Sequence, residues 1–392
     1  FRTVFHLEEA TDGILQGNTF EMGCEGWSSF STRRVIIENN TFLTVQLQNV
    51  SEGGSITNAP AYPSTLHNAI LRNYDVQAKD AYYRYETFTS DGGVGGYSGR
   101  AVRSQGARVT LEQPLLNRPD AWWPLPSHSL DDNWAGAAMV VLGGRGAGDV
   151  VGISASKGNE LQLLKPPAVP LDSTSEITVV PYAGQTILAG NTWINGTSVD
   201  YYGVALELIF ADNTLINMRS RPCPHCGDDQ QLQDPIGGLC THSLVYESGH
   251  DAPSMPNMRV EILGNKLINT NGIVVMAANC GMNSSVQVTS AVPMAPLTQG
   301  FVVRGNTLVR TLPCGFAPRL ALFGVNDTRF YWDFTAQKDC APCKHGAAPC
   351  ADNGINVIGC VRGGVVEANV VAGKVNVNAT NGSRAVLAMR NS

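Results

Sequence analysis

One short pattern of apolar and polar residues recurs along this chain. It consists of two or more apolar residues, one or two others, an asparagine, and an apolar residue two positions later, as in Ile14-Leu15-Gln16-Gly17-Asn18-Thr19-Phe20. Each apolar group predicts a short strand with inward side chains. The Gly-Asn or Asn-Asn step predicts a sharp turn, because these residues tolerate left-handed backbone geometry. Copies of the pattern contain Asn18, Asn40, Asn191, Asn213, Asn265, Asn306 and Asn369, and a looser copy contains Asn73.

The spacing of the copies predicts how the strands stack. Asn18 and Asn40 are 22 residues apart, and so are Asn191 and Asn213. Internal periods on the order of 20–50 residues are typical of solenoids and propellers. The later gaps of 52, 41 and 63 residues leave room for two or three turns with loops. In stacked turns the asparagine amides lie above one another, where they can hydrogen bond along the stack.

We therefore predict an all-β fold, a right-handed parallel β-helix (solenoid) with long disulfide-stapled loops. Val, Ile, Thr and Asn dominate where a helical fold would need Ala, Leu, Glu and Lys. Propeller blades would need about 40 residues each at more even spacing. Residues 1–392 are expected to form a single domain, because each solenoid repeat packs only on its neighbours. Loop excursions are expected at about 79–130, 219–256 and 329–354, and strand-like sequence returns at 138–144 and 150–153.

Composition narrows the classes of function. Charged residues make up only 15% of the chain, and the formal net charge is −6. The chain has no Lys/Arg-rich run, so nucleic-acid binding has little support. It also has no run of apolar residues long enough to predict a membrane span. The chain opens on Phe1 without an initiator Met or a signal peptide, which is expected of a mature form or of a fragment of a longer chain.

Cysteines and glycosylation sequons indicate an oxidising, extracellular compartment. An even number of cysteines that cluster in loop-like sequence is typical of disulfides in a secreted protein. The ten cysteines, all expected to form disulfides, are Cys24, Cys223, Cys226, Cys240, Cys280, Cys314, Cys340, Cys343, Cys350 and Cys360. Asn-x-Ser/Thr sequons without Pro predict N-glycosylation of a surface or secreted protein. They begin at Asn39, Asn49, Asn195, Asn283, Asn326, Asn378 and Asn381.

Two of the cysteine clusters also match the spacing of a redox dithiol or of a zinc site. Cys223-Pro224-His225-Cys226 has the spacing of a redox dithiol, but that chemistry needs the first thiol at a helix N-terminus. Cys-x-x-Cys pairs with a nearby His also match structural zinc sites. The two candidate ligand sets are Cys223, Cys226, Cys240 and His242, and Cys340, Cys343, His345 and Cys350. Their irregular spacing and the oxidising compartment favour disulfides, so we expect no metal and no cofactor.

One set of residues is a candidate for polysaccharide chemistry. Asp228-Asp229 followed by Gly249-His250 resembles the pattern of polygalacturonases. In these enzymes one carboxylic acid protonates the leaving oxygen and a carboxylate activates water. The Asn-Thr-Asp and Arg-x-Lys elements of that pattern are missing here, and Asp pairs beside Gly are also common turn residues. Catalysis by Asp228, Asp229 and His250 is therefore the alternative to a non-catalytic role.

Aromatic residues gather in and next to the first expected excursion. On loops, such residues bind sugars or form protein interfaces, or they fill a small core of the loop itself. They are Tyr82, Tyr83, Tyr85, Trp122, Trp123 and Trp134. The sequence leaves both interpretations open.

Over roughly residues 10–78 and 176–375, the Asn-turn repeat resembles the right-handed parallel β-helix (pectate-lyase-like) superfamily. The Gly/Val/Asn-rich composition is similar to that of β-helical protist surface proteins such as the trypanosome dispersed gene family. With the cysteines and sequons, these resemblances imply a non-catalytic, glycosylated structural or adhesive protein, secreted or on the cell surface, that forms a filament or a surface coat. The expected partners are further copies of the chain, other extracellular proteins or glycans. The alternative is a glycoside hydrolase or lyase on the same scaffold, since fold does not imply function.

Overall fold

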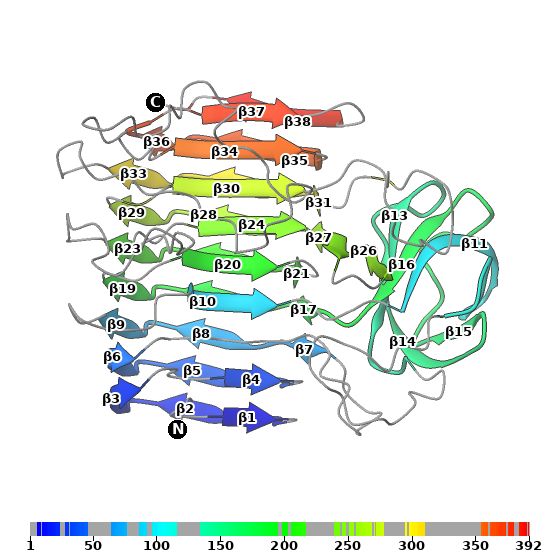
Figure 1. The fold of residues 1–392 in the computed structure, drawn as a ribbon, viewed down its shortest axis with the longest axis horizontal. Helices are drawn as coiled ribbons and strands as arrows, with labels where there is room; N and C mark the ends of the chain where they lie inside the picture. Colours follow the sequence, from blue (N-terminus) through cyan, green and yellow to red (C-terminus); the bar gives the residue numbers. More distant parts are fainter. Residues whose placement is uncertain are drawn as a thin grey trace.

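The computed structural model confirms the predicted all-β fold. Parallel strands stack into a right-handed β-helix, and a smaller barrel lies beside it (Figure 1). The described residues contain no helix. These residues are 6–8, 10–23, 28–30, 32–45, 64–76, 86–91, 96–115, 134–194, 198–202, 205–216, 239–243, 245–247, 251–254, 256–268, 270, 272–277, 295, 298–309, 354–359, 361–373, 375–379, 384–389 and 391.

The coils of the β-helix contribute strands to three parallel sheets, named here by their place in Figure 1. The back sheet contains β2 (Ile14–Gln16), β5 (Ile36–Glu38), β8 (Ala69–Leu71), β18 (Ile187–Ala189), β22 (Ile209–Ala211), β28 (Glu261–Leu263), β32 (Val302–Arg304), β35 (Val361–Glu367) and β38 (Arg384–Met389). The side sheet contains β3 (Thr19–Gly23), β6 (Thr41–Val45), β9 (Tyr74–Val76), β19 (Thr192–Ile194), β23 (Thr214–Ile216), β29 (Lys266–Ile268), β33 (Thr307–Val309) and β36 (Val370–Val371). The front sheet contains β10 (Glu86–Asp91), β20 (Ser198–Tyr202), β24 (Leu239–Ser243), β30 (Gly272–Ala277), β34 (Gly354–Gly359) and β37 (Val375–Ala379).

A corner row of two-residue strands connects the front sheet to the back sheet. It contains β7 (Thr65–Leu66), β17 (Ala183–Gly184), β21 (Ala205–Leu206), β27 (Asn257–Met258) and β31 (Thr298–Gln299). β35 is long enough to pair with both β31 and β32, so it joins the corner row to the back sheet. Two further pairs are β1 (His6–Glu8) with β4 (Ser28–Phe30), and β25 (Val245–Glu247) with β26 (Asp251–Ser254).

The core of the β-helix is a stack of inward side chains, with one set per coil. In a back-sheet strand the middle residue points inward, so Leu188 is fully buried whereas its neighbour Ile187 is 41% exposed. The side sheet adds aromatic rings to the same core. Trp193 stacks on Phe210 with ring centroids 5.8 Å apart. Parallel pairing repeats these positions from coil to coil, so equivalent residues form columns along the axis.

Each three-residue back-sheet strand, from β2 to β32, lies between two residues with left-handed backbone geometry. In one coil these are Glu207 (φ 58°) and Asp212 (φ 53°), and in another they are Gly300 (φ 65°) and Gly305 (φ 67°). The second residue of each pair directly precedes the ladder asparagine, which confirms the predicted turn. The first residue has no sequence signature, because Asp, Arg, His, Gln, Glu and Gly all occupy it in different coils.

Replacement of Ala368 by Gly is expected to raise the free energy of unfolding by about 0.5–1 kcal/mol. Ala368 is exposed and holds φ 55°, a geometry that costs an L-residue roughly 1–2 kcal/mol. The greater freedom of Gly in the unfolded chain offsets part of that gain. Equilibrium urea unfolding measures the change. Ala372→Gly is the control, since Ala372 is also exposed but has no positive φ, and it is expected to destabilise instead.

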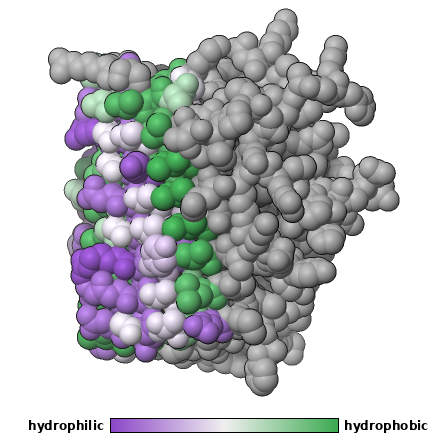
Figure 2. Space-filling view, turned by 90° about the vertical axis from the view of Figure 1, so that its left-hand side faces the viewer, coloured by the Kyte–Doolittle hydropathy of each residue, from purple (hydrophilic) through white to green (hydrophobic). Residues whose placement is uncertain are grey.

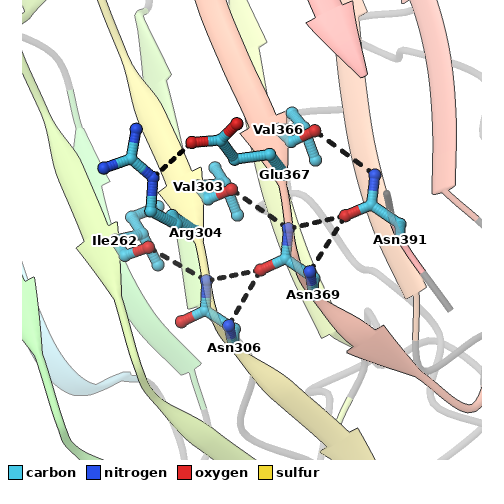
Figure 3. A network of polar contacts seen from close by, with 8 residues as sticks. All are labelled: Ile262, Val303, Arg304, Asn306, Val366, Glu367, Asn369 and Asn391. Atoms are coloured by element: carbon cyan, nitrogen blue, oxygen red, sulfur yellow. Dashed lines mark hydrogen bonds and ion pairs between the residues drawn. The ribbon is translucent and has the colours of Figure 1, made fainter. Parts of the chain in front are cut away.

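Asparagines form a continuous hydrogen-bonded ladder at the corner between the back and side sheets. At each step, the backbone N–H and the Nδ2 of one asparagine donate to the Oδ1 of the asparagine in the next coil. From Asn306 to Asn369 both bonds are 2.9 Å long (Figure 3). The Nδ2 of Asn369 also donates to the carbonyl oxygen of Val303 at 3.0 Å. Within the described residues the ladder comprises Asn18, Asn40, Asn73, Asn191, Asn213, Asn265, Asn306, Asn369 and Asn391, which confirms the predicted stack.

The ladder corrects the predicted number of coils. Asn213 bonds directly to Asn265, across 52 residues of sequence. The next two steps, to Asn306 and then to Asn369, span 41 and 63 residues. Each of these gaps therefore holds one coil with an insertion, and not the two or three turns that the spacing suggested. The longest step is 118 residues, from Asn73 to Asn191, and it contains the barrel.

A closed six-stranded antiparallel barrel is inserted between β10 and β17. Its strands, in order around the barrel, are β11 (Tyr97–Gln105), β12 (Arg108–Leu111), β15 (Glu160–Leu163), β14 (Val150–Lys157), β13 (Ala138–Gly143) and β16 (Glu176–Val180). Its interior is filled by apolar side chains that include Trp134, Met139 and Leu161. Burial raises the pKa of the Tyr97 hydroxyl to about 12, and that hydroxyl donates to the carbonyl oxygen of Arg100 at 2.7 Å. Trp134 was expected either to bind a partner or to fill a small core, and the structure supports the core position.

The barrel and the front sheet correct the predicted loop excursions. The range 79–130 contains β10, β11 and β12, and the range 219–256 contains β24, β25 and β26. The asparagine pattern marks only the corner between the back and side sheets, so strands elsewhere in a coil carry no such signature. The strand-like sequence at 138–144 and 150–153 does form strands, but they belong to the barrel. The excursion at 329–354 lies outside the described residues except for residue 354.

Candidate binding surface

Charged side chains on the back sheet pair with one another along the stack. The Nε of Arg34 lies 2.5 Å from Oδ1 of Asp12, which belongs to the preceding coil. This hydrogen bond holds the pKa of the Asp12 carboxyl below its usual value. Among the described residues, the pairs of this kind are Asp12–Arg34, Glu38–Arg72, Glu207–Arg259 and Arg304–Glu367. Exposed ion pairs contribute little to stability, but they leave these arginines already neutralised by neighbouring carboxylates.

The outward side of the side sheet carries a column of aliphatic side chains. Figure 2 shows it as an apolar band that runs along the stack of coils. One residue per coil contributes, and each is only partly exposed: Leu43, Val76, Ile194, Ile216, Ile268 and Val309. The neighbouring column includes Thr41, Thr192 and Thr214. The aliphatic side chains offer apolar contact area and hold no charge, whereas the neighbouring column also contains the exposed Lys266.

The barrel is docked on the β-helix through β13 and β16. The apolar part of the contact consists of Ala138, Val140, Leu142 and Val180 from the barrel with Leu206 and Met258 from the corner row. Several hydrogen bonds between described residues cross the same contact. Nη1 of Arg259 donates to the carbonyl oxygen of Gly148 at 2.9 Å, and Nε2 of Gln299 donates to that of Leu142 at 2.8 Å. Because β13 and β16 face the β-helix, β11 and β15 lie on the side away from it (Figure 1).

The strands on that far side form a polar surface, which we call the outer face of the barrel. Pairing of β11, β12, β15 and β14 aligns their outward residues in two rows. The first row is Arg103, Thr110, Glu160 and Lys157, and the second row is Gln105, Arg108, Gln162 and Ala155. Residues between them, such as Val109 and Leu161, point inward and are fully buried. A packed core thus fixes the strands that carry the polar rows.

The cations of the outer face differ from those of the back sheet. Arg103, Arg108 and Lys157 are exposed, and in the described part of the chain none of them lies within 4.0 Å of a carboxylate. The single carboxylate in the two rows, that of Glu160, accepts a hydrogen bond from the Thr110 hydroxyl at 2.8 Å through Oε1. Its Oε2 is buried and has no hydrogen-bond partner in the structure. The two rows therefore combine three unpaired cations with one carboxylate.

One acidic residue, Asp172, lies beside Arg103, but its carboxylate binds other groups. Asp172 forms an isolated bridge with Arg103 through the main chain. Its carboxylate, however, accepts hydrogen bonds from the hydroxyl and the N–H of Thr174 and lies 3.9 Å from Arg145. The Thr174 hydroxyl is the main reason that the pKa of Asp172 is lowered. The Asp172 carboxylate is therefore bound by Thr174 of its own turn and lies near Arg145, and it forms no ion pair with Arg103.

Most residues of the sequence-based site hypotheses lie outside the described residues. This holds for the candidate catalytic residues Asp228, Asp229 and His250, and for nine of the ten cysteines. Cys240 lies in β24, as does the candidate zinc ligand His242. Among the described residues, no three His, Cys, Asp or Glu side chains are grouped as a metal site. The disulfide, zinc and catalytic assignments thus stay predictions.

Two of the predicted glycosylation sites fall on described backbone. Asn39 follows β5, is exposed and has φ 53°. Asn378 lies in β37. The others, Asn49, Asn195, Asn283, Asn326 and Asn381, lie outside the described residues. The exposure of Asn39 is what a glycosyl acceptor needs, in contrast to the neighbouring ladder residue Asn40, which is 1% exposed.

The sequence analysis did not identify the outer face. Arg103 and Lys157 lie far apart in the chain, and only the pairing of four antiparallel strands brings them into one row. The one local signal is the polar–apolar alternation of Arg108-Val109-Thr110-Leu111, which is typical of a half-buried strand. That alternation predicts which residues point outward, but not which strands become neighbours.

Comparison with known proteins finds likeness among solved structures only. No known protein family and no curated protein matches the chain. The chain is similar to the tailspike protein gp49 from Pseudomonas phage LKA1, with 11% identity and a TM-score of 0.26, over 93% of this chain and 47% of that one. It is similar to the Streptococcus pneumoniae surface protein and adhesin PfbA, with 11% identity and a TM-score of 0.31, over 93% and 69%.

A third similar structure is the gp54 tailspike of Acinetobacter baumannii bacteriophage AP22 in complex with a capsular saccharide. The identity is 8% and the TM-score 0.22, over 86% of this chain and 45% of that one. The chain thus spans about half of the length of the two tailspikes. These likenesses concern the fold alone. The described residues include no helix that could span a membrane.

Proposed function

We propose that the chain is a non-catalytic adhesive module of an extracellular surface, in which the β-helix is a rigid support and the barrel presents the binding face. The observation that carries the proposal is the orientation of the barrel. It is docked on the β-helix through β13 and β16, while the strands with unpaired, exposed cations lie on the opposite side. Within the described part of the chain, this arrangement leaves the outer face exposed, where it can meet a partner.

The β-helix is well suited to a supporting role. The ladder asparagines from Asn40 to Asn369 are at most 2% exposed, and they bond both to each other and to backbone carbonyls. Fully satisfied buried networks make a structure rigid. A rigid support lowers the ordering entropy that binding would otherwise cost. The even number of cysteines and the sequons support an extracellular location for such a module.

The test is a binding assay against surface glycans, with cleavage measured in parallel. The chain is applied to immobilised polysaccharides, including bacterial capsular saccharides, and to intact cells. We expect reversible binding without release of sugar fragments, and an equal response from Asp229→Asn. Sedimentation of the same material reports on self-association, the other predicted mode of assembly.

Two results would overturn the proposal. If the wild type releases sugar fragments and Asp229→Asn does not, the chain is a polysaccharide-active enzyme, and Asp229 has a catalytic role. If the wild type binds no polysaccharide and no cell surface, and does not associate with itself, the chain is not an adhesive module.

A further inference from the structure

We propose that the outer face of the barrel binds an acidic polysaccharide, whose carboxylate or sulfate groups meet Arg103, Arg108 and Lys157. This inference rests on the proposed adhesive function and names the ligand and the residues of its binding face. It starts from a contrast within one chain. The back sheet pairs Arg34, Arg72, Arg259 and Arg304 with carboxylates. The barrel leaves its outer cations without such partners.

The geometry of the face suits an extended polymer. Arg103 and Lys157 are at opposite ends of one row that crosses four strands, and Arg108 lies in the adjacent row. Neighbouring strands are about 4.8 Å apart, so this row is about 14 Å long. A polymer lying across the strands can meet charges at both ends of the row at once. Several such contacts along one molecule add through effective concentration, although each alone is weak.

The chemistry of the face favours a sugar polymer over other anionic partners. Arginine forms forked hydrogen bonds to carboxylates and related oxyanions. The amides of the exposed Gln105 and Gln162 can donate to and accept from hydroxyl groups. Protein interfaces have an apolar, often aromatic core, and single-stranded nucleic acids stack on aromatic rings. The two rows contain no aromatic and no large aliphatic residue.

The carboxylate of Glu160 allows a second test, in which removal of a charge should raise the affinity for an acidic ligand. It lies between Thr110 and Lys157 in the first row, and Thr110 holds it there. Against an acidic ligand this charge is repulsive. Glu160→Gln keeps an oxygen that can accept the Thr110 hydroxyl, so it removes the charge without removing that contact. This variant is expected to bind the acidic polysaccharide a few-fold more tightly.

The experiment measures binding of the whole chain to polygalacturonate, a polyuronate, with neutral dextran as the uncharged comparison. We expect the wild type to bind polygalacturonate and not dextran, with an affinity that falls as salt is raised, because salt screens exposed charges. The variant Arg103→Gln/Arg108→Gln/Lys157→Gln is expected to lose at least about tenfold in affinity. The same measurements in an Asp229→Asn background exclude any contribution from cleavage.

The matched control removes the same number of arginine or lysine charges from the β-helix. Arg34→Gln/Arg72→Gln/Arg304→Gln changes the net charge equally, and Gln185 shows that Gln occupies one of these left-handed positions in the native chain. This control is expected to bind within about twofold of the wild type. Thermal unfolding of both triple variants checks that each is folded, and Glu160→Gln gives a gain that misfolding cannot produce.

Failure of this inference is distinguishable from failure of the proposed function. If both triple variants lose affinity equally, net charge and not the outer face controls binding, and the inference is wrong. If the wild type binds neutral glycans or cells but not polygalacturonate, the inference is wrong while the adhesive function stands. If the wild type binds nothing in either assay and does not self-associate, both are wrong.

Discussion

Replacement of Asn213 by Ala is expected to lower the free energy of unfolding by about 3–5 kcal/mol, among the largest losses for a single residue of this chain. The side chain of Asn213 is fully buried. Its Oδ1 accepts from the backbone N–H and the Nδ2 of Asn191, at 2.9 and 3.0 Å. Its Nδ2 donates to the carbonyl oxygen of Leu188 at 3.0 Å and to Oδ1 of Asn265 at 3.1 Å.

Removal of this side chain takes a hydrogen bond from several buried groups. The N–H of Asn191 and the carbonyl oxygen of Leu188 both lose their contact with Asn213, at a depth that water does not reach. Each unsatisfied buried group costs about 1–3 kcal/mol. The N–H of residue 213 still donates to Asn265, so the coil on the C-terminal side keeps one of its two bonds. The damage is therefore concentrated on the coil of Asn191.

The neighbouring residue provides the control for this prediction. Asp212 is adjacent in sequence, holds the left-handed turn at φ 53°, and corresponds to Gly190 and Gly264 in the flanking coils. Asp212→Gly is therefore expected to change the free energy of unfolding by less than about 1 kcal/mol. Equilibrium unfolding in urea, followed by circular dichroism, compares the two variants. Equal losses from both would mean that the turn, and not the ladder, determines stability here.

The asparagine ladder is the part of the fold that the sequence predicts best. It can be predicted because one column of identical side chains, each with the same bonds, requires the same residue in coil after coil. The looser copy at Asn73 belongs to the same ladder, with bonds of the same kind to Asn40 and Asn191. Asn391 continues the ladder too, although no copy of the pattern was assigned to it.

The remaining features leave no comparable signal, for physical reasons. Front-sheet positions need only apolar side chains that fit the core, so no single residue type recurs there. The barrel is antiparallel and lies inside one coil, so its strands follow neither the 22-residue spacing nor the asparagine pattern. The outer face depends on which strands become neighbours, as the row from Arg103 to Lys157 shows. Long-range pairing of this kind is decided by the packed core and not by local residue preference.

The two parts of the molecule also differ in how they use charge. On the β-helix, stacking places residues of successive coils at regular spacing, so Arg304 and Glu367 can neutralise each other as part of the repeat (Figure 3). On the barrel, Arg108 stands opposite Gln162 and beside Gln105, and the pairing gives it no acid. Cations that lack internal partners keep their hydrogen-bonding capacity for an external one. This difference is why we propose a binding role for the barrel and a supporting role for the β-helix.

Replacement of Gly364 by Ala is expected to lower the free energy of unfolding by about 3 kcal/mol, at the upper end of the usual cost of overpacking. A Cβ at this position would lie 2.0 Å from Cζ of Phe301. Phe301 occupies the equivalent position in the preceding coil and is 1% exposed, so its ring cannot turn outward without leaving the core. The large ring of one coil thus fills the space that the missing side chain of the next coil leaves.

Gly363 separates this steric effect from backbone strain. It has φ 63°, and the atom nearest to an added Cβ is the backbone nitrogen of Gly300, 4.0 Å away. Gly363→Ala is therefore expected to cost only the strain of a left-handed residue, roughly 1–2 kcal/mol. Gly364 has no positive φ, so its substitution tests packing alone. Urea unfolding of the two adjacent variants gives the comparison directly.

A second substitution in the preceding coil completes the argument. Leu208 and Val260 occupy the position of Phe301 in earlier coils, so a smaller aliphatic side chain fits this column. Phe301→Leu is expected to cost stability in the native background, because it opens a cavity beside Gly364. In the Gly364→Ala background it should restore stability, with a coupling energy of up to about 3 kcal/mol. If Gly364→Ala is equally destabilising in both backgrounds, the ring of Phe301 is not what excludes a side chain at residue 364.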